Sequence, residues 1–166
     1  MKQKTFFKLL VIMILLTIFN LSASPTAYAQ SNANTNKQIE LRLKGLCKAL
    51  TKDFDSQQYE SKSFKSLQTR VRDAEQKYGD IFWNFDIYLD AQDCGTVTLH
   101  SYKVLSVKGN TAKVRVVFKD SDFGLRPTII LVMVYENNNW FVNDVIFTDG
   151  SSWRNECNKF IKNGYN

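Results

Sequence analysis

The feature that most constrains the fold is a change of hydrophobic period about halfway along the chain. Apolar side chains in the first half recur every three or four residues, which predicts helices. In the second half they alternate, which predicts strands, and Gly109-Asn110 and residues 137–139 supply tight turns between neighbouring strands. A final helix can begin at Ser151 or Ser152. The predicted helices are 37–53 and 61–78, and the predicted strands are 96–107, 111–119, 128–135 and 140–148.

Helices that precede a run of hairpin-connected strands give an α+β domain. We therefore expect N-terminal helices packed on a curved, cone-like antiparallel sheet, followed by a short C-terminal helix. The strand at 128–135 is apolar on both faces, so we expect it to be central and covered on both sides. Residues 81–93 are both aromatic and acidic, and we expect a short strand and a turn there.

The first 29 residues contain the three parts of a secretory signal peptide. Three lysines precede an apolar run at 9–19, and residues 27–29 (Ala-Tyr-Ala) form the small-x-small pattern that a signal peptidase cleaves. The apolar run is shorter than the ~20 residues that a spanning helix needs. We expect cleavage between Ala29 and Gln30, a periplasmic or secreted product, and no membrane association after cleavage.

Cleavage leaves 137 of the 166 residues, which is enough for one domain. Residues 30–36 are polar and aperiodic, which predicts a flexible mature N-terminus before a single domain at 37–166. The leader carries three of the 22 basic residues, so 19 remain against 16 acidic ones, a net charge of +3. These charges are scattered, whereas nucleic-acid binding needs a clustered basic surface, and we expect no nucleic-acid partner.

Three cysteines lie in the exported part: Cys47, Cys94 and Cys157. In an oxidising compartment one pair can form a disulfide and leave an odd thiol, and the sequence does not choose the pair. Alternatively, Cys47 and Cys157 are small buried residues on apolar helix faces. Because there is no CxxC pair and His100 is the only histidine, we expect no metal site, and no cofactor motif is present.

Three aspartates, Asp86, Asp90 and Asp93, lie close together among Trp83 and Tyr88. Clustered carboxylates raise one another's pKa, so one reading is an acidic site in an aromatic pocket, for a cation or for a general base. The other reading is that these aspartates accept backbone hydrogen bonds in turns.

Asp144 is a second candidate for a general base. It alternates with Trp140, Val142 and Ile146, which predicts that all four share one face of the last strand. On a concave face, desolvation would make Asp144 a base. The alternatives are a buried ion pair for Asp144 and a core position for Trp140.

Residues 85–93 (FDIYLDAQD) and 140–145 (WFVNDV) resemble a bacterial family of small exported proteins of unknown function. Its members carry an Ala-Gln-Asp segment after two helices and a terminal W-x-I-x-D-I/V strand, and belong to the nuclear-transport-factor-two-like superfamily. The resemblance covers about 39–161 and implies a curved sheet wrapped on helices, with a pocket at the open end. Several members have proline where this chain has Ile87. The superfamily includes isomerases, dehydratases, cyclases and proteins without chemistry, so the fold implies no activity.

We expect an exported, non-enzymatic binding or interaction module whose partner is a protein or a small ligand. An immunity protein that neutralises a toxin would be one such module, and the open sheet face could form a homodimer through 111–118 and 129–135. The alternative is a small isomerase or hydrolase-like enzyme. It would use Asp144 or Asp86 with the hydroxyl of Tyr88 or Tyr102, so convergence of Asp144 with a tyrosine in a pocket would favour it. The residues expected to line a pocket are Trp83, Asp90, Asp93, Tyr102 and Trp140.

Overall fold

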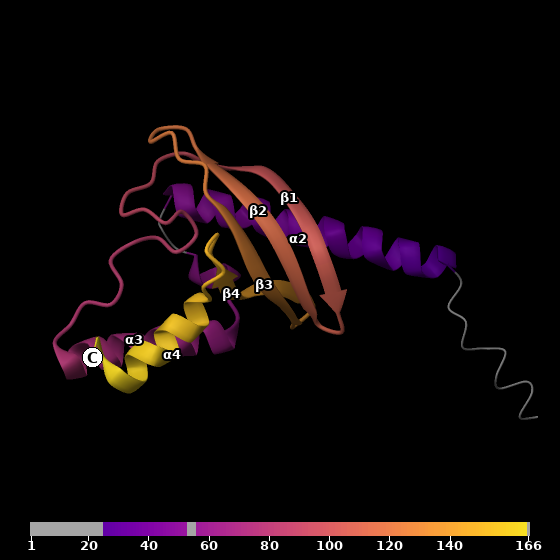
Figure 1. Ribbon diagram of the computed structural model, residues 1–166. Helices are drawn as coiled ribbons and strands as arrows, with labels where there is room; N and C mark the ends of the chain where they lie inside the picture. Colours follow the sequence, from indigo (N-terminus) through magenta and orange to yellow (C-terminus); the bar gives the residue numbers. More distant parts are fainter. Residues whose placement is uncertain (1–24, 53–55, 166) are drawn as a thin grey trace, which may run out of the picture. The chain divides into compact units, whose positions relative to one another are not determined.

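The computed structural model describes residues 25–52 and 56–165 (Figure 1). Most of the predicted signal peptide, residues 1–24, therefore lies outside the described residues. The order of elements confirms the predicted α+β class, with helices first, then four antiparallel strands and a short last helix. These elements are α2 (Pro25–Lys52), the 3-10 turn η1 (Gln57–Tyr59), α3 (Lys62–Tyr78), β1 (Val97–Lys108), β2 (Thr111–Asp120), β3 (Thr128–Glu136), β4 (Asn139–Ile146) and α4 (Trp153–Asn163).

Helix α2 starts at Pro25, well before the predicted start near residue 37. Residues 30–36, predicted to be flexible, belong to this helix. Proline suits the first position of a helix, and neither glycine nor a second proline follows before Gly45. Residues up to Asn36 and from Lys37 onward form two separate units, and the following description concerns the second. None of the helices among the described residues is both long and apolar enough to cross a membrane.

The four strands form one meander in the order β1-β2-β3-β4, a curved sheet that does not close on itself (Figure 1). Gly109 (φ 58°) lies in the β1–β2 turn. Asn137 and Asn138 (φ 50° and 59°) form the β3–β4 turn, as expected for a two-residue hairpin. Two register shifts bend the long strand β1. The sheet thus matches the prediction in topology and nearly in bounds.

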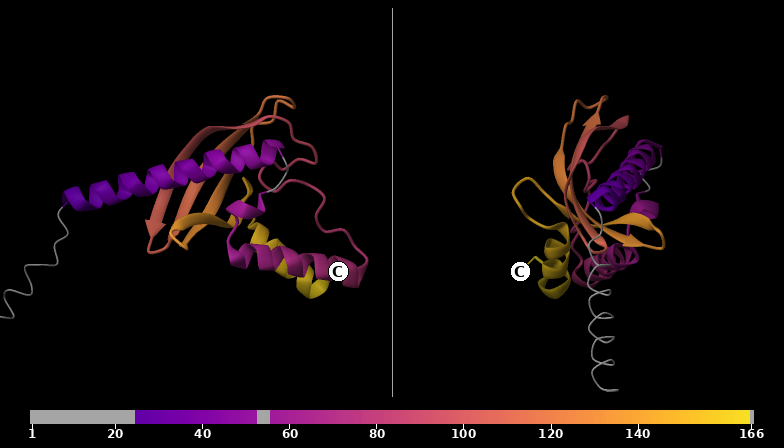
Figure 2. Two further views of the ribbon diagram at one scale, coloured as in Figure 1. Left: turned by 180° about the vertical axis from the view of Figure 1, so that it is seen from behind. Right: turned by 90° about the vertical axis from the view of Figure 1, so that its right-hand side faces the viewer.

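The hydrophobic core lies between this sheet and residues 37–52 of α2, which run across one face of the sheet (Figure 2). Alternate side chains of β2 and β3 are buried there, whereas the outward side chains of β3 are half-buried rather than fully covered. Thr51 Oγ1 accepts a hydrogen bond from the Val97 amide at 2.9 Å, and Arg42 Nε donates to the Trp140 carbonyl at 2.9 Å. The core includes Ile39, Leu43, Leu46, Leu50, Val114, Val116, Phe118, Leu131 and Met133.

Helices α3 and α4 pack side by side (Figure 1). Ser61 caps α3 by accepting a hydrogen bond from the Phe64 amide, and Gly79 ends it in the left-handed conformation (φ 75°). Ser152 caps α4 by accepting from the Asn155 amide. The sequence predicted the cap of α4, at Ser151 or Ser152, and the end of α3 at residue 78, whereas the cap at Ser61 was not predicted.

The segment between α3 and β1 contains no regular strand, so the expectation of a short strand within 81–93 is wrong. Its only pairing is an isolated antiparallel bridge between Asp86 and Ala91. The bridge closes a tight turn in which Asp86 binds backbone amides with its own side chain, and these amides are therefore not available to a strand partner.

Candidate ligand pocket

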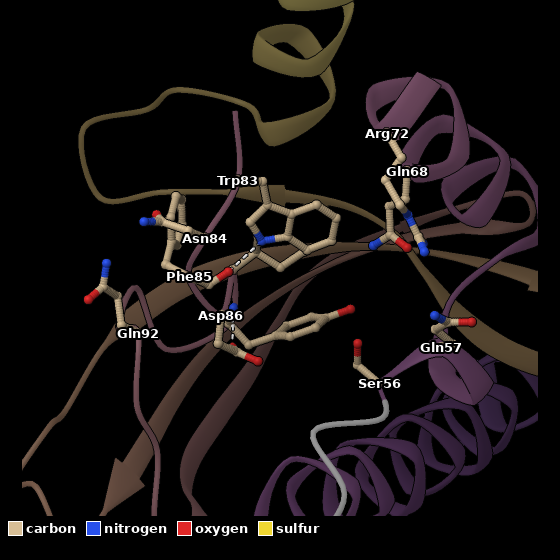
Figure 3. A pocket seen from close by; sticks show the side chains of 11 residues that line it. Ser56, Gln57, Gln68, Arg72, Trp83, Asn84, Phe85, Asp86 and Gln92 are labelled. Atoms are coloured by element: carbon tan, nitrogen blue, oxygen red, sulfur yellow. Dashed lines mark hydrogen bonds between the residues drawn. The ribbon is translucent and has the colours of Figure 1, made fainter. Parts of the chain in front are cut away.

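A pocket of about 310 Å³ lies where three segments of the chain meet (Figure 3). Ser56 and Gln57 come from the start of η1, Gln68 and Arg72 come from α3, and the remaining lining residues belong to 83–92. A volume of this size is at the lower end of the range for small-molecule sites. It corresponds to roughly ten water molecules at their volume in the liquid. The pocket can therefore hold a small ligand.

A turn at 86–91 builds the floor of the pocket. Asp86 Oδ1 accepts hydrogen bonds from the amides of Tyr88 (2.8 Å) and Leu89 (3.0 Å), and the Asp86 amide donates to the Ala91 carbonyl at 2.7 Å. Asp90 takes a left-handed backbone conformation (φ 51°) on the exposed side. The turn buries Tyr88 and its two neighbours. Asp86 is thus a turn former, as one reading of the sequence proposed, and it also lines the pocket.

The hydroxyl of Tyr88 is bound to a buried carboxylate. It donates to Glu60 Oε1 at 3.0 Å, and Ser56 Oγ donates to the same oxygen at 2.7 Å. Tyr88 is fully buried and Glu60 is 1 % exposed. Burial, and after it the charge of Glu60, raises the pKa of Tyr88 well above its ordinary value, so the phenol stays a hydrogen-bond donor. No described residue donates to the second oxygen, Glu60 Oε2.

Trp83 forms a fixed aromatic wall. Its backbone amide donates to Glu75 Oε1 at 3.1 Å, and its indole N–H donates to the carbonyl of Phe85. The indole ring meets Trp153 of α4 edge-on, with ring centres 5.3 Å apart, and Phe85 packs on the same tryptophan at 5.7 Å. Helix α4 therefore positions this wall, although none of its residues lines the pocket.

The opposite side of the pocket is a face of α3. Gln68 is 3 % exposed, yet none of the described residues forms a hydrogen bond with its amide. Arg72 follows one helical turn later and is exposed. It belongs to neither of the two salt bridges found in the described part of the chain, which join Lys44 to Glu40 and Lys159 to Glu156. Figure 3 shows both side chains extending from α3, across the pocket from Asp86.

The electrostatics of the floor are set by Asp86. Burial raises the pKa of Asp86, and the charge of Glu60 adds to this, whereas the two amide hydrogen bonds from Tyr88 and Leu89 lower it. Only Asp86 Oδ1 accepts hydrogen bonds within the described chain. Its Oδ2 therefore remains an acceptor for a group in the pocket.

Asp144 does not lie at this pocket, and the predicted face for it is wrong. Met133 pairs with Val142 but Val132 pairs with Asp144, so Asn143 is an extra residue that forms a β-bulge. The bulge reverses the alternation: Val145, not Asp144, follows Val142 into the core.

Asp144 instead joins β4 to α4. Its Oδ1 accepts from the Arg154 amide at 2.9 Å, and its Oδ2 accepts from Ser152 Oγ at 2.7 Å. The Arg154 guanidinium donates to the Asn143 carbonyl rather than to the carboxylate. No tyrosine hydroxyl converges with Asp144 among the described contacts.

The other predicted site residues are dispersed. Tyr102 lies on β1 and donates to Glu40 Oε2 at 3.2 Å, and Trp140 is 4 % exposed and packs on Tyr135 in the core. Asp90 and Asp93 are exposed and do not line the pocket. Of the candidates, the structure brings together Trp83, Asp86 and Tyr88.

The three cysteines are free thiols in the structure. Cys47 and Cys157 are buried core residues, and burial raises the pKa of each thiol to about 12. Cys94 is half-buried with a pKa of about 11, also raised first by burial. These surroundings suit small apolar residues, the alternative that the sequence left open. In the described part of the chain, no three residues of the metal-binding types gather into a candidate site.

Sequence reasoning missed Gln68, Arg72 and Glu60. Gln68 had a detectable signal, because it lies between Phe64 and Val71 on the apolar stripe of α3, where an amide is out of place. Arg72 and Glu60 had none, since the first is an ordinary surface charge in sequence and the second stands in an aperiodic connection.

No protein-family model matches the chain, and comparisons with curated proteins and with solved structures find no match either. The resemblance to the nuclear-transport-factor-two-like superfamily therefore stays a prediction, and the pocket must be interpreted from its own residues.

Proposed function

We propose that the protein is an exported binding module and that the pocket between α3 and residues 83–92 binds a small polar ligand. The observation that carries this proposal is Gln68: it lines the pocket, is 3 % exposed as a whole, and its amide has no partner among the described residues. Its amide atoms are not among the buried unpaired polar atoms of the described chain, which are Glu60 Oε2 and the indole nitrogens of Trp140 and Trp153, so the amide is open to the pocket. A ligand in the pocket can therefore exchange hydrogen bonds with it.

Binding is favoured over catalysis because the candidate acids and bases do not converge on one free pair in the pocket. Tyr88 donates to Glu60, which leaves Asp86 Oδ2 as the one candidate group of the predicted enzyme that is free in the described pocket lining. Asp144 accepts from the first turn of α4, outside the pocket lining. A small enzyme of the isomerase or hydrolase kind would need the Tyr88 hydroxyl to leave Glu60 and act beside Asp86, so it is the second choice.

The binding proposal is tested by ligand-observed NMR with the protein purified from cells that express the full chain. The probes are amino acids, dipeptides, neutral sugars, sugar phosphates and carboxylic acids. We expect at least one class to bind, and Asn84→Trp to abolish that binding, because Asn84 lines the pocket and an indole there fills it. Asn158→Trp, on the exposed surface of α4, is the matched control and should bind as the parent does. Binding that survives Asn84→Trp would refute the pocket as the site.

Export is tested separately, by extracting the periplasm and the medium of the same cells. We expect the protein there, with a mass that corresponds to residues 30–166, because cleavage is predicted after Ala29. An uncleaved chain that stays with the cytoplasmic fraction would contradict this part of the proposal and leave the pocket unaffected.

A further inference from the structure

The ligand class can be narrowed from the charges that line the pocket, and this step rests on the proposed function. The lining contains one basic and one acidic side chain, Arg72 and Asp86. In Figure 3 they lie on different sides of the pocket, with Trp83 between them. Neither forms a salt bridge within the described residues, where the ion pairs are Lys44–Glu40 and Lys159–Glu156. The pocket therefore presents a separated pair of opposite charges.

We propose that the pocket binds a small zwitterion, an α-amino acid or a dipeptide, with its carboxylate on Arg72 and its ammonium group on Asp86 Oδ2. A guanidinium binds a carboxylate through two parallel hydrogen bonds, and an ammonium group donates to carboxylate oxygens. Asp86 is held ready for this role, because its Oδ1 is fixed by two backbone amides and its Oδ2 is left as an acceptor. A ligand with a single charge would satisfy only one end.

The groups between the two charges suit the rest of such a ligand. Gln68 offers an amide that can both donate and accept, and it sits one helical turn from Arg72. The rings of Trp83 and Phe85 form an apolar wall that can cover the aliphatic part of an amino acid. Glu60 lies behind Tyr88 and adds negative charge at the Asp86 end. This negative end repels anions, so a sugar phosphate or a dicarboxylate fits less well than a zwitterion.

The size of the pocket supports the same class. About 310 Å³, roughly ten water volumes, accommodates a single amino acid or a short dipeptide but not a longer peptide. The whole zwitterion must then lie between the two charged residues. Both of its ends would be recognised at once, which is the basis of the test.

The test compares each amino acid with analogues that lack one charge. The protein is titrated calorimetrically with the proteinogenic L-amino acids and with Ala-Ala, and the tightest ligand is repeated as its C-terminal amide and as its N-acetyl derivative. We expect each analogue to bind about tenfold or more weakly, the loss of one charge-assisted hydrogen bond. Failure of every amino acid and dipeptide to bind overturns the proposal, as does equal binding of the amide.

Two variants test which residue binds the carboxylate of the ligand and which binds its ammonium group. Arg72→Gln should bind the amino acid and its amide within about threefold of each other, because the group that distinguishes them is gone. Asp86→Asn should in the same way lose the preference for the free ammonium over the N-acetyl form. Arg70→Gln is the matched control on α3, since Arg70 is exposed and does not line the pocket, and it should keep both preferences. Should a neutral sugar bind instead and be lost in Asn84→Trp, the zwitterion is refuted while the binding function stands.

Discussion

Gln68 is the residue whose role in binding is most clearly separable from folding. It lies on the apolar stripe of α3, and its amide is open to the pocket without a partner among the described residues, so no protein hydrogen bond depends on it. Methionine has nearly the same shape and no amide. We expect Gln68→Met not to lower the free energy of unfolding, because no hydrogen bond within the described chain is lost, and to weaken ligand binding. Urea unfolding monitored by tryptophan fluorescence measures the first, and calorimetry the second.

The control for this change is Gln76→Met on the exposed face of α3, where glutamine and methionine have similar helix propensities and stability should not change. A loss of stability in Gln68→Met would show that the amide is satisfied in the folded protein, and it would remove the main support for the pocket.

Asp86 makes the stability depend on pH in an unusual direction for an aspartate. Its pKa is raised in the folded protein, chiefly by burial, so the folded state holds the proton more tightly than the unfolded state. This contribution is present below the unfolded pKa of about 3.9 and is lost as the pH rises through the folded pKa. Ionisation of this carboxylate is therefore a cost to folding.

Asp86→Asn should remove this cost, because the amide oxygen can still accept the hydrogen bonds of the turn. We expect the variant to gain stability over the parent as the pH rises from about 4 to 7. Urea unfolding of both proteins at the two pH values gives the comparison. If the stability of the variant relative to the parent is instead lower at pH 7 than at pH 4, the ionised carboxylate is stabilised in the fold, contrary to the raised pKa.

Among the elements, the junction of β4 with α4 depends most on a single side chain. Asp144 accepts hydrogen bonds from Ser152 and Arg154 in the first turn of α4. We expect Asp144→Ala to lower the free energy of unfolding by about 1–2 kcal/mol, the range for the loss of partly buried hydrogen bonds at the start of a helix. Thermal and urea unfolding measure it. Asp93→Ala, an exposed aspartate outside the pocket, is the control and should change little.

The same variant bears on the alternative function. If Asp144 only joins two elements, Asp144→Ala should bind the ligand with unchanged affinity at a temperature where it is fully folded. An affinity that falls much more than in the control would place Asp144 in the binding site and contradict its assignment as a cap.

At the scale of elements, the sequence predicted what short-range patterns determine. The strands, the cap at Ser152 and the end of α3 at residue 78 follow from alternation, capping and backbone conformation, each decided within a few residues. It failed where a single residue interrupts the pattern. The bulge at Asn143 leaves no mark in the alternation, and it moves Asp144 to the other face of β4. The part of α2 at residues 30–36 was not predicted as a helix because its sequence is polar and shows no hydrophobic period.

At the scale of the molecule, the pocket could be predicted only in part, because its walls are far apart in sequence. Trp83, Asp86 and Tyr88 were identified from one aromatic and acidic stretch, and they do line it. Gln68 and Arg72 reach the same place only through the packing of α3 against this stretch. The amides of Phe82 and Trp83 donate hydrogen bonds to Glu75 Oε1 and so hold this stretch to α3, and no sequence pattern specifies these bonds.

The exposed face of β1 and β2 is cationic. Lys103, Lys113, Arg115 and Lys119 are exposed, and Lys103 pairs directly with Arg115 across β1 and β2. Strand β1 contains no acidic residue, and the only one in β2, Asp120, is buried. A homodimer through this open face, which the sequence suggested, would bring two cationic surfaces together around a two-fold axis.

We therefore expect a monomer at about 0.1 mM protein in physiological salt, where repulsion across such an interface outweighs the half-buried side chains of β3. Size-exclusion chromatography with light scattering gives the mass directly. The combined substitutions Lys113→Glu and Arg115→Glu provide the comparison, since mixing this variant with the parent should produce a salt-sensitive heterodimer if charge is what keeps the face unpaired. A parent protein with the mass of two chains would contradict the expectation, and a dimer that resists high salt would locate the contact elsewhere.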